Sequence, residues 1–124
     1  MEKLIHIIPT PIGNLDDISL RALNILSDAD IILAEDTRVT KKLLVHYNIQ
    51  TKMLSYHAFN EHKRLKKIIN DIENGLTIAL VSDAGTPGIS DPGYLIIREC
   101  IKNEIRIECL PGPTACIPAL VQSG

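Results

Sequence analysis

The sequence predicts an α/β domain built on a five-stranded, mostly parallel β-sheet with helices on both faces. Hydrophobic periodicity switches repeatedly along the chain between short apolar runs and amphipathic segments with a helical repeat. The apolar runs are of the kind that crossover helices bury on both faces of a parallel sheet. No internal repeat, low-complexity segment or linker interrupts this pattern, so we expect residues 1–124 to form a single domain.

Five short segments carry the strand pattern. They are residues 4–8, 31–34, 52–55, 77–81 and 106–110. A helical segment lies between each pair of successive strands, and such crossover connections are what parallel pairing needs.

The clearest helix is predicted over residues 61–73. Its apolar side chains recur at the i, i+3, i+4 and i+7 positions of one helix face, with charge on the other. They are Leu65, Ile68, Ile69 and Ile72. The pair Asn74-Gly75 ends this helix, because glycine readily adopts the conformation found just beyond a helix C-terminus.

Four further helices are expected on the same reasoning. They cover about residues 19–26, residues 37–47, a segment from Pro92 toward Lys102, and a segment that begins around Pro113. Ser90 or Asp91 is expected to cap the third of these, with Pro92 in its first turn.

The composition is that of an ordinary soluble domain, with 45% hydrophobic and 23% charged residues. No unbroken apolar run approaches the roughly 18 residues of a membrane span, and the N-terminus leads into a strand without a cleavable signal. We therefore expect a cytoplasmic protein, with neither a membrane nor DNA as a partner.

The cysteines and histidines show no disulfide or metal pattern. Cys100, Cys109 and Cys116 are odd in number and lack Cys-x-x-Cys spacing, so we expect small buried hydrophobic side chains. The four histidines lack a pattern such as His-Glu-x-x-His, and no metal site is predicted. The net charge is −2 with histidine neutral, so any RNA contact needs a local basic patch or a part outside this chain.

Residues 81–93 are the most informative segment. Three glycines, two prolines and two aspartates crowd into this loop directly after a predicted strand. Glycine lets the backbone approach a ligand closely, proline fixes the turns, and carboxylates accept hydrogen bonds from hydroxyls or amines. The density favours a ligand-binding loop, although turn chemistry alone accounts for any single residue.

The other distinctive segments also follow predicted strands. They are residues 9–15, 34–38, 55–61 and 111–115. In open parallel sheets, ligands bind beyond the carboxyl ends of the strands. We expect the loops after the first, second, fourth and fifth strands to line one crevice, with the loop after the third at its flank.

The common nucleotide-binding motifs are absent. Residues 9–15 contain only Gly13, whereas the dinucleotide fingerprint Gly-x-Gly-x-x-Gly needs three glycines, and no Gly-x-x-x-x-Gly-Lys-Ser/Thr loop occurs. The two prolines around Thr10 predict a rigid extended turn, which serves either a ligand or only a stiff connection.

Together these segments resemble the tetrapyrrole methylase superfamily, and within it the enzymes that methylate a ribose 2′-hydroxyl of small-subunit ribosomal RNA. The resemblance runs through the whole chain. It implies a two-domain methyltransferase that uses S-adenosylmethionine and often pairs as a homodimer. This chain would supply the N-terminal half of the cofactor cleft.

The resemblance also implies the residues that contact S-adenosylmethionine. They are Ile12, Gly13, Asp83, Gly85, Thr86, Gly88, Thr114 and Ala115. The Asp83 carboxylate suits ribose hydroxyls or the cofactor's ammonium group, and its alternative role is to stabilise its own turn. Thr114 is equally compatible with a plain position at the start of a helix.

Three residues are candidates for the proton transfer. Glu35 and Asp36 end the second strand, where the pair would polarise a ribose hydroxyl or bind a cation. The alternative is that Asp36 or Thr37 caps the next helix. His57 is the third candidate, and no spacing in the chain chooses among the three.

Two basic strips accompany these residues. Arg38 and Lys41, with Lys42, lie beside the carboxylate pair and are the expected RNA contacts, because guanidinium matches phosphate geometry. The second strip, in residues 62–67, is expected to be a solvated helix face.

The function that the resemblance implies is 2′-O-ribose methylation of a cytidine in 16S ribosomal RNA. Two alternatives stay open: a methylase of corrin or porphyrin precursors, and a non-catalytic module that binds cofactor or a partner chain. The segments 35–38 and 55–57 favour the ribosomal enzymes over the tetrapyrrole ones. Because half a cleft exposes apolar surface, we expect the isolated chain to bind cofactor weakly and to self-associate.

Overall fold

The computed structural model describes residues 2–89 and 92–124. The strands are β1 (Leu4–Ile7), β2 (Ile31–Ala34), β3 (Lys52–Ser55), β4 (Ile78–Leu80) and β5 (Arg106–Cys109). They form one sheet in the order β3-β2-β4-β1-β5, and every neighbouring pair is parallel. The predicted α/β fold with a parallel sheet is confirmed.

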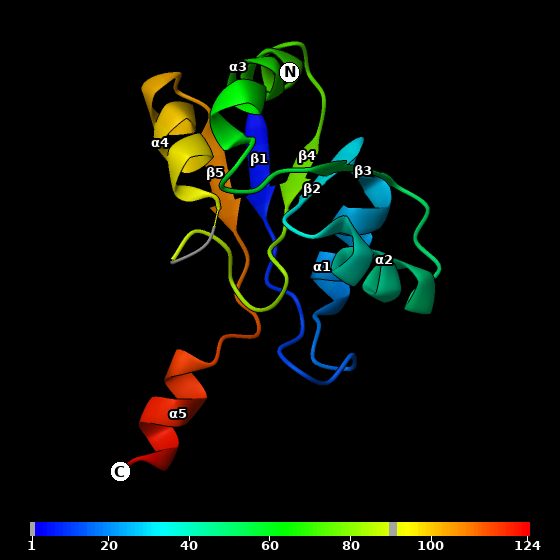
Figure 1. Ribbon diagram of the computed structural model, residues 1–124, viewed down its shortest axis with the longest axis vertical. Coiled ribbons are helices and arrows are strands. Elements are labelled where there is room, and N and C mark those ends of the chain that lie inside the picture. Colours follow the sequence, from blue (N-terminus) through cyan, green and yellow to red (C-terminus); the bar gives the residue numbers. More distant parts are fainter. Residues whose placement is uncertain (1, 90–91) are drawn as a thin grey trace.

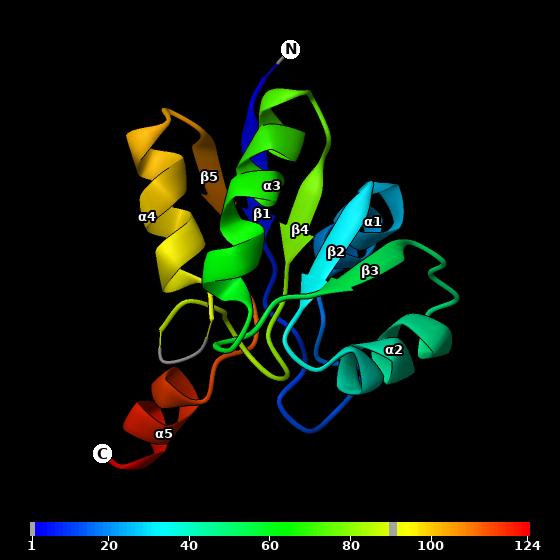
Figure 2. The same cartoon turned by 45° about the horizontal axis from the view of Figure 1, so that its top comes forward.

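Helices cover both faces of this sheet. They are α1 (Leu20–Asp28), α2 (Thr37–His46), α3 (Glu61–Glu73), α4 (Tyr94–Lys102) and α5 (Cys116–Gln122). Figures 1 and 2 show α1 and α2 on one side of the sheet, α3 and α4 on the other, and α5 outside both layers near the C-terminus. No helix in the described ranges is long and apolar enough to span a membrane.

Alternate side chains of the strands enter two separate cores, as the pleat of a sheet requires. Ile5 and Ile78 belong to the core beneath α3 and α4, where Ile68 and Ile96 are also buried. Ile32 and Ala79 belong to the core beneath α1 and α2, with Leu26. Burial on both faces explains why the central strands are continuous apolar runs without polar alternation.

The position of β4 shapes the carboxyl edge of the sheet. The chain passes from β1 through α1 to β2, and through α2 to β3, before α3 returns it to β4 between β2 and β1. The loop after β4 therefore leaves toward the α4 face, whereas the loops after β1 and β2 leave toward the α1 and α2 face. Loops that diverge in this way open crevices beside the strand between them.

The helix ends follow capping signals where the sequence carries them. Ser19 caps α1 by accepting a hydrogen bond from the Ala22 N–H at 3.0 Å. Gly75 has φ +90° just beyond α3, as predicted for the end of that helix.

Two predicted helix starts were too early. The fourth helix begins at Tyr94, and Pro92 precedes it, because Gly93 occupies the N-cap position with φ +147°. The predicted capping by Ser90 or Asp91 lies outside the described residues.

The last helix begins at Cys116, because residues 111–115 form an irregular loop. No residue of α5 is buried, and Figure 1 shows the helix pointing away from the sheet. The predicted burial of the cysteines is correct for Cys100 and wrong for Cys109 and Cys116, which are exposed. Cys116 is exposed because α5 packs against no layer of the domain.

Tyr56 is the largest of the fully buried side chains and lies in the core beneath α3 and α4. Its hydroxyl has no hydrogen-bond partner among the described residues. Burial, with smaller contributions from Glu61 and Cys100, raises the pKa of this phenol above its ordinary value. A buried hydroxyl without a partner carries a desolvation cost and returns no hydrogen bond.

The substitution Tyr56→Phe is therefore expected to raise the free energy of unfolding by about 1 kcal/mol, because it removes only the unpaired hydroxyl. Tyr56→Ala is the matched control and should lower it by about 3–5 kcal/mol, because it empties the ring's space. Urea denaturation followed by circular dichroism measures both. A loss of stability in Tyr56→Phe would show that the hydroxyl has a partner.

Candidate functional site

The carboxyl edge of the sheet gathers the loops that the sequence singled out. Because β2, β4, β1 and β5 are consecutive neighbours, the loops that follow them lie side by side. The loop after β3 crosses from this edge strand to α3, where Ala58 lines a further hollow with Glu35 and Tyr94. The expectation that four of these loops line one crevice is wrong: the structure forms two hollows on either side of the loop after β1, and the loop after β2 lines neither of them.

The loops after β1 and β4 are joined by a short antiparallel bridge between Thr10 and Gly85. The Thr10 N–H donates to the Gly85 carbonyl at 3.1 Å, and the Gly85 N–H donates to the Thr10 carbonyl at 2.9 Å. The Thr10 hydroxyl also donates to the Ser82 carbonyl at 3.3 Å. Thr10 and Ser82 are both buried, so this bridge forms a fixed base for the site.

The loop after β5 is held against the same base. The Thr86 hydroxyl donates to the Pro113 carbonyl at 3.3 Å. Gly112 faces Pro9 so closely that a Cβ atom there would lie 2.8 Å from the Pro9 Cβ. Gly85, at φ +76°, adopts a conformation that favours glycine and lies next to Ile12. Gly112 is therefore required for space, and Gly85 for its backbone conformation.

The larger hollow has a volume of about 820 Å³ and lies between the loops after β1 and β5. It is lined by Ile12, Asp16, Asp17, Ile18, Ser19, Thr86, Leu110, Pro111, Gly112, Pro113, Thr114, Ile117 and Pro118. The lining combines apolar side chains with two carboxylates and three hydroxyls. Such a mixture suits a ligand that has an apolar ring and several polar groups.

The smaller hollow, of about 260 Å³, lies on the other side of the loop after β1. It is bounded by that loop, by α2 and by the start of the loop after β4. Its lining residues are Thr10, Pro11, Gly13, Asn14, Leu15, Val39, Thr40, Lys42, Leu43, Ser82 and Asp83. Asp83 and Lys42 are its charged groups.

The predicted cofactor residues divide between these two hollows. Ile12, Thr86 and Thr114 line the larger one, and Gly13 and Asp83 line the smaller one.

Three others have different positions. Gly85 belongs to the bridge between the two loops. In the described part of the chain, neither hollow has Gly88 or Ala115 in its lining.

Asp83 ties the loop after β4 to the loop after β2. Its Oδ1 atom accepts a hydrogen bond from the Asp36 N–H at 3.0 Å, and its own N–H lies 3.4 Å from Glu35 Oε1. The carboxylate therefore supports the neighbouring loop, which differs from the expected alternative of bonding within its own turn.

Asp36 is engaged on both carboxylate oxygens. Oδ1 accepts from the Arg38 backbone N–H at 3.0 Å and caps α2, while Arg38 Nη2 donates to Oδ2 at 2.9 Å. These hydrogen bonds to Arg38 lower the pKa of Asp36 and raise that of Arg38. The capping role that the sequence left open for Asp36 is thus present in the structure.

His57 follows the edge strand β3 and lines neither hollow. The Nδ1 atom of its ring accepts a hydrogen bond from the Phe59 backbone N–H at 3.2 Å, and the His57 backbone N–H donates to Asn60 Oδ1 at 2.8 Å. Arg38 and Lys41 border a separate shallow groove along α2. The structure does not bring His57 together with the cofactor residues.

Sequence reasoning missed the acidic part of the larger hollow. Asp16, Asp17 and Ser19 follow the loop after β1 and line this hollow, yet they lie outside the segment that drew attention. The sequence signal that could have indicated these residues was the pair of aspartates just before the N-cap of α1. That pattern also occurs at ordinary helix starts.

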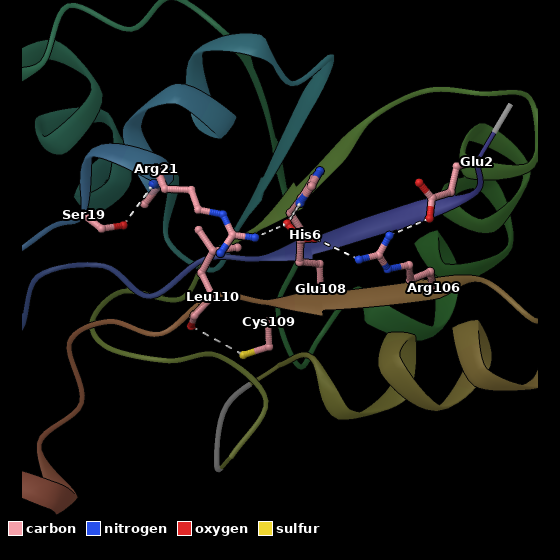
Figure 3. Close-up of polar contacts among 9 residues, drawn as sticks. Glu2, His6, Ser19, Arg21, Arg106, Glu108, Cys109 and Leu110 are labelled. Atoms are coloured by element: carbon pink, nitrogen blue, oxygen red, sulfur yellow. Dashed lines mark hydrogen bonds and ion pairs between the residues drawn. The ribbon is translucent and has the colours of Figure 1, made fainter.

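An ion-pair network joins α1 to β5 (Figure 3). Arg21 on α1 donates to Glu108 on β5 at 2.8 Å. Arg106 contacts the second Glu108 oxygen at 3.4 Å and Glu2 at 2.7 Å, and His6 Nδ1 lies 3.4 Å from the first. The network links two elements that lead into the lining of the larger hollow, since Ser19 precedes α1 and Leu110 follows β5, but its own residues line no part of it.

In the described ranges, no three His, Cys, Asp or Glu side chains are grouped to hold a metal ion.

Comparison with known proteins relates the whole arrangement to one family. The family model described as Tetrapyrrole (Corrin/Porphyrin) Methylases matches residues 4–124. The chain is 54% identical over 125 residues to ribosomal RNA small subunit methyltransferase I of Mesomycoplasma conjunctivae, and 50% identical over 121 residues to that of Vibrio cholerae. These matches cover 100% and 98% of this chain but 52% and 42% of the two relatives. The chain thus spans about half the length of the curated relatives it matches.

Two solved structures share the fold. Uroporphyrin III C-methyl transferase from Thermus thermophilus matches with a TM-score of 0.68 and 13% identity, over 90% of this chain and 49% of the other. Cobalt precorrin-4 methyltransferase, a cobalamin biosynthetic enzyme, matches with a TM-score of 0.68 and 21% identity, over 98% and 50%. At these identities the likeness shows the fold alone.

The contact between Gly112 and Pro9 gives a test of how tightly the loops are held. Gly112→Ala is expected to lower the free energy of unfolding by about 1–3 kcal/mol, because the added methyl group forces the two loops apart. Lys66→Ala is the control, because Lys66 is an exposed residue of α3 and lies in neither loop. Thermal denaturation of both variants measures the difference, and equal stabilities would contradict the close contact.

Proposed function

The chain belongs to the tetrapyrrole (corrin/porphyrin) methylase family, and from this premise we propose that it forms the S-adenosylmethionine-binding half of an RNA methyltransferase. The proposed reaction is methylation of a ribose 2′-hydroxyl, that of a cytidine in 16S ribosomal RNA. The observation that carries the proposal is the convergence of the loops after β1, β4 and β5 on one hollow at the carboxyl edge. The names of the relatives at 50% identity or above support the choice of RNA over a tetrapyrrole.

The larger hollow fits S-adenosylmethionine chemically. The ligand has an apolar adenine ring, two ribose hydroxyls, and ammonium and carboxylate groups at one end. Ile12 and Ile18 supply apolar surface, Asp16 and Asp17 supply carboxylates for hydroxyl or ammonium groups, and Thr114 supplies a hydroxyl. The volume of about 820 Å³ lies in the range typical of sites for ligands of this size.

The backbone of the loops contributes as well. Gly13 has φ +148° and no atom near the place where a Cβ would lie, so its backbone is open to a ligand. Gly85 keeps the space between Ile12 and Pro113 free of a side chain. Asp83 acts by holding the loop after β2 in position through the Asp36 N–H.

When bound, S-adenosylmethionine would supply a methyl group on a positively charged sulfur that needs no further activation. The protein's part is then to align the acceptor hydroxyl and to take its proton. Asp36 is poorly suited as the base, because Arg38 occupies both its oxygens and lowers its pKa.

His57 is turned toward its own loop, where its Nδ1 accepts the Phe59 N–H. Glu35 lies at the end of β2 and lines a hollow that opens toward α4, and its Oε1 lies 3.4 Å from the Asp83 N–H. We therefore assign the proton-accepting role to Glu35.

The groove along α2 supports an RNA contact. Its volume is about 570 Å³, and it is lined by Leu15, Arg38, Lys41, Lys42, Val45 and His46. The Arg38 side chain is 88% exposed and its orientation is fixed by Asp36, so it presents a guanidinium ready for phosphate. Arg38 and Lys41 are the proposed phosphate contacts.

We further assign the whole protein to the cytoplasm and to a homodimer. The exposed apolar side chains of α5, with Leu120 at 67% and Val121 at 73% exposure, support a packing partner for this helix. Either the remainder of a two-domain protein or a second copy would cover them.

Calorimetric titration of S-adenosylmethionine into this chain tests the cofactor site. Weak binding is expected, with Asp16→Ala and Asp17→Ala each reducing the affinity about tenfold, the effect of losing a hydrogen bond to a charged group. Asp28→Ala is the matched control, because Asp28 ends α1 at the opposite edge of the sheet and should leave the affinity unchanged. Equal affinities in all three variants would place the cofactor elsewhere.

A further inference from the structure

We propose that Phe59 and Tyr94 provide stacking positions for two neighbouring unpaired RNA nucleotides, at the carboxyl edge of the sheet between the N-terminal ends of α3 and α4. The inference rests on the proposed function, since it adds a second RNA contact to a methyltransferase that acts on RNA. It concerns a surface separate from both hollows and from the groove along α2, and this surface includes Glu35, the proposed proton acceptor.

The exposure of these two rings is the first observation. The Phe59 side chain is 97% exposed and the Tyr94 side chain 67% exposed, although the chain has only one Phe and three Tyr. The other aromatic residues have internal roles: Tyr56 is fully buried, and the Tyr47 hydroxyl donates to the Leu15 carbonyl. Aromatic rings open to solvent are typical of surfaces that bind another molecule.

The local structure holds Phe59 outward. Asn60 accepts the His57 N–H at 2.8 Å through its side chain, and its amide nitrogen lies 3.2 Å from the Ser55 hydroxyl. The Phe59 N–H donates to His57 Nδ1 at 3.2 Å, and the two rings meet edge to face at 5.9 Å. The turn thus presents a pre-oriented ring, which lowers the entropy cost of stacking a base on it.

A hollow separates the two aromatic positions. It has a volume of about 530 Å³ and is lined by Ala58 and Glu61 on the α3 side, by Tyr94 and Leu95 on the α4 side, and by Glu35. A space of this size admits a nucleobase. Ala58 precedes Phe59 directly, so one base on the Phe59 ring and one in the hollow would be neighbours.

The charges around the hollow fix the direction in which RNA would lie. Glu35 and Glu61 repel phosphate, so the base and not the backbone enters the hollow. Lys63 and Arg64 follow one turn along α3, and within the described residues no ion pair involves either side chain. Aromatic platforms beside basic side chains are the usual means of binding single strands. The basic strip that the sequence predicted as merely solvated thus gains a role at its N-terminal end.

Fluorescence anisotropy with a labelled single-stranded RNA dodecamer, against the duplex of the same sequence, tests the proposal. Phe59→Ala and Tyr94→Ala should each weaken single-strand binding about 5- to 150-fold, the range for loss of one base–aromatic stack. Ile101→Ala is the control: this side chain is 66% exposed at the other end of α4 and should have no effect. Circular dichroism confirms that the surface variants fold.

Rescue separates stacking from simple apolar contact. Phe59→Tyr should retain the affinity and Phe59→Leu should lose it, whereas equal binding by these two variants would overturn the proposal in favour of an apolar protein contact. Unchanged binding in Phe59→Ala, or equal affinity for single strand and duplex, would also overturn it. The proposal would also be overturned if the chain formed a dimer that dissociates in Phe59→Ala while RNA binding stays intact.

The two proposals can fail separately. If the chain binds cofactor but Phe59→Ala does not change RNA binding, this inference alone is refuted. If Phe59→Ala weakens RNA binding but the chain binds no cofactor, the cofactor proposal alone is refuted.

Discussion

The paired hydrogen bonds between Thr10 and Gly85 are the contact on which the rest of the site depends. They form an antiparallel bridge just beyond the parallel β1–β4 pairing, at the place where the two loops are about to diverge to opposite faces. From this fixed base, Asp83 reaches the loop after β2 and Thr86 reaches the loop after β5. One loop therefore contacts all three of its neighbours, and the hollows lie in the spaces between those contacts.

The site owes its shape to rigid backbone rather than to long side chains. Buried hydroxyls at Thr10 and Ser82 satisfy carbonyls inside the base, and Gly112 permits a backbone contact with Pro9 that no larger residue allows. Rigid loops on a parallel sheet suit a ligand that must be held in one orientation, because little conformational freedom is lost when it binds. Methyl transfer to an unreactive hydroxyl makes this demand, since alignment supplies much of the rate.

The fold was predictable because each strand and helix carries its own periodicity. The gathering of the distinctive loops at the carboxyl edge followed from the rule that parallel sheets bind ligands there, whereas the strand order β3-β2-β4-β1-β5 came only from the structure. What the sequence did not predict depends on contacts between segments far apart in the chain. Asp83 supports the Asp36 N–H, and Asp16 lines the larger hollow, because of where β4 and β1 stand relative to their neighbours. No local pattern specifies such a contact.

Amide hydrogen exchange with and without S-adenosylmethionine tests the central claim most directly, because it reports on each loop separately. The account predicts slower exchange, on adding the cofactor, in residues 10–13, 83–88 and 111–115 together. Exchange at the opposite edge of the sheet, in residues 28–30 and 75–77, should not change. Protection confined to that opposite edge, or in only one of the three loops, would contradict a cofactor site formed by their convergence.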